Sequence, residues 1–165
     1  MRILLSIVMC VGLLLLAGCT SFRPLYGKGP DGEGVTSSLA AVGIPEQHAR
    51  SAQLVRNELL SSMGSAPAKF SLKMLVTEKT VEVSTLSASN LHRKRFSLAV
   101  HFELVNISSG AVSNSGDSFS NVSFDTVRQP VADLQAANNA MERAAKEVGQ
   151  DLRQRNAAYF ADHPA

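Results

Sequence analysis

The residues with the clearest chemical role stand near the start of the chain, in the run Leu16-Ala17-Gly18-Cys19. The thiol of Cys19 is a nucleophile that can take a diacylglyceryl group, and the small residues before it suit a cleavage site. Arg2 and the apolar run from Ile3 to Leu16 complete a secretory signal, and that run is shorter than the roughly 20 residues needed to span a bilayer. We therefore predict a lipoprotein signal peptide over residues 1–18, removed in the mature chain, and lipidation at Cys19.

The predicted modification also indicates where the protein is held. Cleavage before Cys19 leaves an N-terminus that can take a third acyl chain, and two or more chains hold a protein on a membrane where one gives only marginal binding. The next residue is Thr20, whereas Asp there favours the inner membrane in enteric bacteria, so we expect the periplasmic side of the outer membrane. The alternatives are an ordinary secretory signal with an incidental cysteine, or a short transmembrane anchor.

Composition limits what the mature chain can do. Without Arg2 it carries 15 basic and 14 acidic residues, so its net charge near +1 gives no reason to expect nucleic acid as a partner. Cys10 leaves with the signal peptide and Cys19 is consumed by lipid, which leaves no thiol for a disulfide, a metal or catalysis. The length of residues 19–165 suits one domain with a modest core.

Residues for catalysis or cofactor binding are sparse. The sequence has neither G-x-S-x-G nor H-E-x-x-H, and its four histidines are far apart and lack ligand spacing: His48, His92, His101 and His163. Gly27, Gly29 and Gly32 satisfy G-x-G-x-x-G, but no strand precedes them and no helix opens from them. We predict that the protein is not an enzyme and has no cofactor or metal beyond the covalent lipid on Cys19.

One basic cluster, His92-Arg93-Lys94-Arg95, follows the Ser/Asn-containing stretch 87–90 and is expected in the connection between two strands. Such side chains can hold phosphate or carboxylate groups, which Arg can bind in bidentate fashion. The alternative is a solvated hairpin end whose charge discourages edge pairing. Arg93, Lys94 and Arg95 are the candidate binding residues.

The remaining chain reads as a tether followed by one domain. Residues 19–36 are rich in Gly and Pro, which favours a flexible tether, although Phe22, Leu25 and Tyr26 could dock on the domain, the membrane interface or a partner. A single domain is expected over residues 37–161, with a C-terminal tail at 162–165. Alternating apolar residues predict strands at 38–44, at 69–85 with a bulge near 78–80, at 96–104, and at 112–127 with a phase break.

Two segments show helical spacing. The first covers 45–63 and has Pro45 at its first position. The second begins at Gln129-Pro130 and places one apolar side toward the core, formed by Leu134, Ala137, Met141, Ala144, Val148, Leu152 and Tyr159. The order β-α-β-β-β-α predicts an α+β fold, a small and mainly antiparallel sheet of about four strands with two helices packed on one face.

The whole chain to about Phe160 resembles the lipopolysaccharide-assembly lipoprotein LptE family in its alphaproteobacterial form. The most specific match is Phe22-Arg23-Pro24-Leu25-Tyr26-Gly27 directly after the Leu-Ala-Gly-Cys site. Weaker matches are Leu54-Val55-Arg56-Asn57-Glu58-Leu59-Leu60, Phe102-Glu103-Leu104-Val105-Asn106, Arg153, and Ala157-Ala158-Tyr159-Phe160.

This resemblance implies a small sheet backed by two helices that fills the lumen of a large outer-membrane β-barrel, LptD. It also implies a non-enzymatic role in moving lipopolysaccharide to the cell surface. On this basis Arg93, Lys94 and Arg95 are expected to bind lipopolysaccharide phosphates or acidic sugars. The alternative is a generic periplasm-facing lipoprotein that serves another envelope complex as an interaction module.

Overall fold

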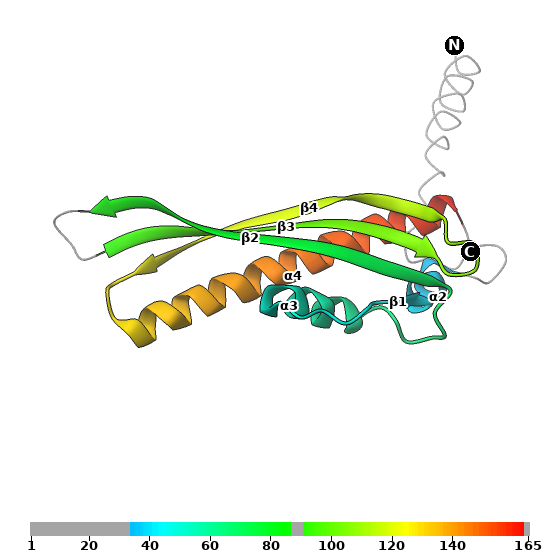
Figure 1. The fold of residues 1–165 in the computed structure, drawn as a ribbon, viewed down its shortest axis with the longest axis horizontal. Helices are drawn as coiled ribbons and strands as arrows, with labels where there is room; N and C mark the ends of the chain where they lie inside the picture. Colours follow the sequence, from blue (N-terminus) through cyan, green and yellow to red (C-terminus); the bar gives the residue numbers. More distant parts are fainter. Residues whose placement is uncertain (1–33, 87–90, 164–165) are drawn as a thin grey trace, which may run out of the picture.

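The computed structural model describes residues 34–86 and 91–163, which form an α+β fold with its two longer helices on one side of a single sheet (Figure 1). The elements are α2 (Val35–Ala40), β1 (Val42–Gly43), α3 (Arg50–Leu60), β2 (Phe70–Leu86), β3 (Leu91–Asn106), β4 (Val112–Thr126) and α4 (Pro130–Asp162). Among the described residues the strand order is β1-β2-β3-β4, with β1 parallel to β2 and the other neighbours antiparallel. This confirms the predicted class, to which the structure adds the short helix α2.

The core lies between the sheet and the helices, and β3 contributes most regularly to it. Alternate residues of a strand face opposite sides of a sheet, so the apolar series of β3 falls on the helix side. All five members are at most 5% exposed: Phe96, Leu98, Val100, Phe102 and Leu104. The predicted strand is therefore confirmed, but it begins at Leu91 rather than Phe96.

Both neighbours of β3 contain a register shift. In β2 the shift lies between Glu82 and Ser84, a few residues beyond the predicted bulge at 78–80. In β4, Leu104 pairs with Asn114 while Val105 pairs with Val112, so Ser113 is the extra residue. The apolar pattern of β4 departs from alternation for a second reason, because Phe119 lies on the face away from the helices and is 75% exposed.

The first part of the domain differs from the sequence prediction. Residues 38–44 were expected to form a strand, but α2 continues to Ala40 and only Val42–Gly43 pairs with β2. The tertiary environment overrides local propensity here, because α2 buries Val35 and Leu39 in the core. Helix α3 starts at Arg50 and not at Pro45, and the Arg56 guanidinium binds the carbonyl oxygens of Ile44 and Pro45 at 3.2 and 3.1 Å.

Helix α4 starts at Pro130, as predicted, and its 33 residues make it about 50 Å long. Helix α3 has only 11 residues and lies beside the middle of α4 (Figure 1). For this reason Leu134, expected in the core, is 63% exposed, whereas Leu152 is fully buried. The two helices meet so closely at Gly149 that a Cβ there would lie 2.7 Å from Cγ of Glu58.

Candidate functional site

The predicted basic residues lie within strand β3, not in the connection that precedes it. The sequence prediction of a loop is therefore wrong for these residues, because pairing with β2 and β4 extends β3 back to Leu91. Strand alternation then divides the three candidates. Arg93 and Arg95 are exposed on the face away from the helices, while Lys94 is half-buried on the helix side.

Arg93 is already engaged with a carboxylate of the neighbouring strand. Its Nε and Nη2 donate to the two carboxylate oxygens of Asp125 at 2.8 and 3.1 Å. These hydrogen bonds lower the pKa of Asp125 and raise the pKa of Arg93. Arg95 stands in register between Val81 and Ser123, and neither it nor Lys94 has an ion-pair partner among the described residues.

His92 connects three segments at this end of the sheet. Its Nδ1 lies 3.1 Å from Oε1 of Glu82, and Nε of Arg128 donates to its Nε2 at 3.1 Å. Because Arg can only donate, Nε2 must be the acceptor, and the Nδ1–H tautomer then donates to Glu82. Arg128 has a φ of 59°, a left-handed backbone that is strained for a residue with a side chain. His92 therefore holds the β4–α4 connection in place.

The outward side chains of β2, β3 and β4 form a surface that we call the uncovered face, since none of the helices within 34–86 and 91–163 packs on it (Figure 1). Its central part comprises Leu75, Thr77, Lys79, Arg93, Arg95, Ser97, Ala99, His101, Asp117, Phe119, Asn121, Ser123 and Asp125. Cross-strand hydrogen bonds join Ser97 Oγ to Asn121 at 2.6 Å and His101 Nδ1 to Asp117 at 2.8 Å. Leu75 and Phe119 are 70% and 75% exposed beside them.

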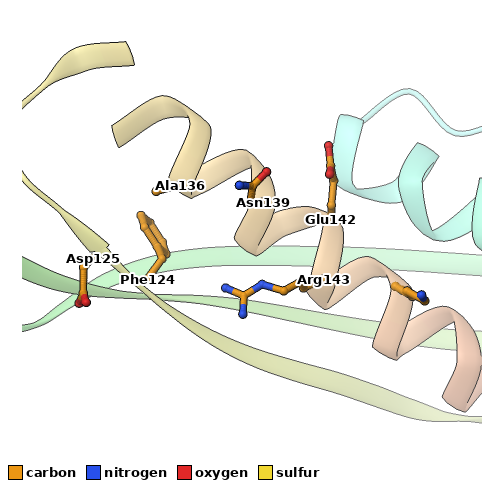
Figure 2. Close-up of a pocket in the computed structure, with 7 residues that line it drawn as sticks. Phe124, Asp125, Ala136, Asn139, Glu142 and Arg143 are labelled. Carbon is orange, nitrogen blue, oxygen red and sulfur yellow. The ribbon is translucent and has the colours of Figure 1, made fainter. Parts of the chain in front are cut away.

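On the opposite side of the sheet, a cavity of about 630 Å³ opens between β4 and the first half of α4, and we call it the α4–β4 groove. Its lining residues are Phe124, Asp125, Ala136, Asn139, Glu142, Arg143 and Lys146. Figure 2 shows the guanidinium of Arg143 directed toward the space beside Phe124, while Glu142 and Asp125 point away from that space. Nη2 of Arg143 donates to the carbonyl oxygen of Ser123 at 3.5 Å.

The groove was not predicted from the sequence. Glu147 lies four residues beyond Arg143 on α4, but it accepts a hydrogen bond from Ser120 Oγ at 2.5 Å. The only local signal was the row of polar residues four apart on α4. The packing of α4 across the edge of β4, which no local pattern encodes, brings Arg143 to Phe124.

The described residues contain little that could support a metal site. Within 34–86 and 91–163 no group of three or more His, Cys, Asp or Glu side chains could hold a metal ion. The ring of His163 stacks on that of Tyr159 with 4.7 Å between the ring centroids, and its Nδ1 contacts the Tyr159 carbonyl oxygen.

Within residues 34–86 and 91–163 no helix combines the length and apolar character needed to cross a membrane. Cys19, the signal segment 1–18 and residues 19–33 of the predicted tether lie outside the described residues.

Comparisons with known proteins identify relatives by fold. No protein-family model matches the sequence, and no curated protein matches it. A solved structure from Caulobacter crescentus CB15, assigned as a lipoprotein, is 25% identical with a TM-score of 0.67; the match covers 77% of this chain and 96% of that one.

Two further solved structures share the fold at lower identity. A minor lipoprotein from Acinetobacter baumannii is 11% identical with a TM-score of 0.54, and the match covers 71% of this chain and 88% of that one. The rare lipoprotein B from Shewanella oneidensis is 12% identical with a TM-score of 0.55, and the match covers 74% of this chain and 96% of that one. These two matches show a shared fold alone, whereas the match to the Caulobacter crescentus structure, at 25% identity, supports the interpretation of this chain as a lipoprotein.

Proposed function

We propose that the protein is an outer-membrane lipoprotein that packs inside an LptD-type barrel and assists the transport and assembly of lipopolysaccharide. The role is one of binding and support, without catalysis or a cofactor beyond the lipid on Cys19. The observation that carries the proposal is the uncovered face, present on a fold that the chain shares with lipoproteins. The motif resemblance to the LptE family supports the same choice.

The chemistry of the uncovered face suits a wet, polar partner surface. The interior of a large outer-membrane barrel is polar, and most side chains of this face are hydroxyl, amide or charged groups. Ser97 and His101 already hydrogen-bond to cross-strand partners. These side chains therefore lose few hydrogen bonds when a partner protein displaces water from the face. Leu75 and Phe119 add exposed apolar side chains that lose contact with water when a partner covers this face.

The position of the basic residues fits contact with a ligand away from the membrane anchor. Register places β1 at the end of the sheet that holds Phe70 and Asn106, and the chain enters the domain at this end through α2. Arg93 is 13 residues from Asn106 along β3, which is about 44 Å at the usual rise of a strand. In this proposal the lipid on Cys19 holds one end of the domain, and Arg93, Lys94 and Arg95 meet lipopolysaccharide phosphates near the other.

Co-purification of the tagged, lipidated protein from detergent-extracted membranes tests the partner. We expect a large barrel of the LptD type in near-equal amount, identified by mass spectrometry. Phe119→Arg should greatly reduce that amount, because it places a charge at an apolar anchor of the uncovered face. The matched control is Val131→Arg, since Val131 is 83% exposed on α4 and lies outside that face. Recovery of the protein alone, or with an unrelated envelope complex, would overturn the proposal in favour of a generic interaction module.

Alanine variants test the basic residues separately. Arg95→Ala should weaken binding of purified lipopolysaccharide more than Arg93→Ala, because Arg93 must first leave Asp125. The triple variant of Arg93, Lys94 and Arg95 should bind more weakly than either single variant. Unchanged binding by the triple variant would remove these residues from the proposal while leaving the barrel partnership to be judged by co-purification.

A further inference from the structure

The α4–β4 groove combines an apolar floor with a cationic rim. Phe124 is 9% exposed and forms the floor together with Ala136. Arg143 and Lys146 stand one turn apart on α4 and are both exposed. Lys94 pairs in register with Phe124 and lies on the same side of the sheet, so it adds a third positive charge close to the floor.

The carboxylates near the groove are directed away from its apolar floor or engaged elsewhere. Asp125 follows Phe124 in the strand and therefore faces the other side, where it is bound by Arg93. Glu142 points away from the space beside Phe124 (Figure 2), and Glu147 is used by Ser120. Arg143 is therefore the charged side chain that faces the apolar floor, and Lys146 stands one turn further along the rim.

We propose that the α4–β4 groove binds a phosphate-bearing membrane lipid, with an acyl chain against Phe124 and Ala136 and the phosphate between Arg143 and Lys146. An apolar floor selects hydrocarbon, and charge complementarity selects an anionic head group that Arg can hold by two hydrogen bonds. The volume of about 630 Å³ lies within the range of about 300–1,000 Å³ typical of ligand pockets. The inference rests on the proposed function for its choice of lipid, since lipopolysaccharide carries both acyl chains and phosphate groups.

Photo-crosslinking of the full lipidated protein in detergent tests the groove directly. The probe is a tetradecyl phosphate that carries a diazirine in its chain, and the comparison probe is the uncharged tetradecyl maltoside with the same diazirine. We expect the phosphate probe to label peptides containing Phe124 and Ala136 about tenfold more than the maltoside, because a charge-assisted contact is worth roughly that factor. Inorganic phosphate alone should not displace the probe.

Two pairs of variants assign the labelling to the groove. Arg143→Gln with Lys146→Gln should reduce labelling about tenfold, whereas Arg50→Gln, an exposed cation on α3, should not change it. Ala136→Phe should fill the groove and block labelling, while Ala132→Phe on the exposed side of the same helix should not. Far-ultraviolet circular dichroism verifies that each variant is folded.

Three results would overturn the groove as a lipid site: equal labelling by the uncharged probe, displacement by inorganic phosphate, or labelling that survives Ala136→Phe. None of them depends on the barrel. If an LptD-type barrel co-purifies while the groove fails, only this inference is lost. If the groove binds the probe while no barrel co-purifies, the proposed function is lost and the groove remains a lipid site.

Discussion

Gly149→Ala tests the close contact between α3 and α4. In an isolated helix this change would stabilise by about 1 kcal/mol, because glycine is the poorer helix former. In the folded protein the new Cβ would lie 2.7 Å from Cγ and 2.9 Å from Cβ of Glu58. Rotation of the Glu58 side chain can move Cγ away, but Cβ is fixed by the α3 backbone and stays 2.9 Å from the new methyl group. The helices must separate, and overpacking of this kind costs about 1–3 kcal/mol.

The expected net result is a loss of about 1 kcal/mol, measured by urea unfolding followed by circular dichroism at 222 nm. Ala158→Gly, at an exposed position of the same helix, is the matched control and should cost about 1 kcal/mol by propensity alone. In a Glu58→Gly background, which carries its own helix-propensity cost, adding Gly149→Ala should no longer destabilise, since the obstructing atoms are then absent. If Gly149→Ala instead stabilised the protein by the full propensity difference, the close approach of the two helices would be refuted.

Three further outcomes follow from single contacts. Partial burial would raise the pKa of Asp151, but the nearby Ser118 hydroxyl, the hydrogen bond that Arg155 Nε donates to the carboxylate at 2.7 Å and the charge of Arg155 outweigh it, so the pKa is lowered. The stabilising contribution of this carboxylate should be present above its unfolded-state pKa and disappear as pH falls through its folded-state pKa. Asp151→Asn should therefore flatten acid unfolding curves. Arg93→Ala should leave the thermal midpoint unchanged, because the exposed pair with Asp125 is screened by water. Leu134→Ser should also leave the urea midpoint nearly unchanged, whereas Leu152→Ala should cost about 2–5 kcal/mol, since only Leu152 is buried.

Local pattern was sufficient for the long elements of this fold. The alternation from Phe96 to Leu104 identified β3 and its buried side, and Pro130 marked the start of α4, because each signal depends on residues near one another in the chain. The same reasoning failed over residues 38–49. There Ala40, Ala41 and Pro45 are weak local signals, and the contacts of α2 with α4 and of Arg56 with Ile44 determine which residues form helix.

The candidate site was predicted only in part for a related reason. Composition singled out the basic run, but whether Arg93, Lys94 and Arg95 share one surface depends on whether they lie in a loop or a strand. Once β3 extends to Leu91, strand alternation separates Lys94 from the two arginines. The α4–β4 groove could not be predicted, because Phe124 and Arg143 meet only through the packing of α4 on β4.

The unequal lengths of α3 and α4 give the molecule a gradient of local stability. One end is held by α2, β1 and α3 together, whereas the end that carries His92 and the start of α4 has a single helix across long strands (Figure 1). Regions with fewer buried contacts open at lower free energy than the rest of a domain. Backbone amides around Phe124 therefore exchange with solvent before those around Leu104, and the end of the molecule that bears the basic side chains can loosen around a ligand while the other end stays folded.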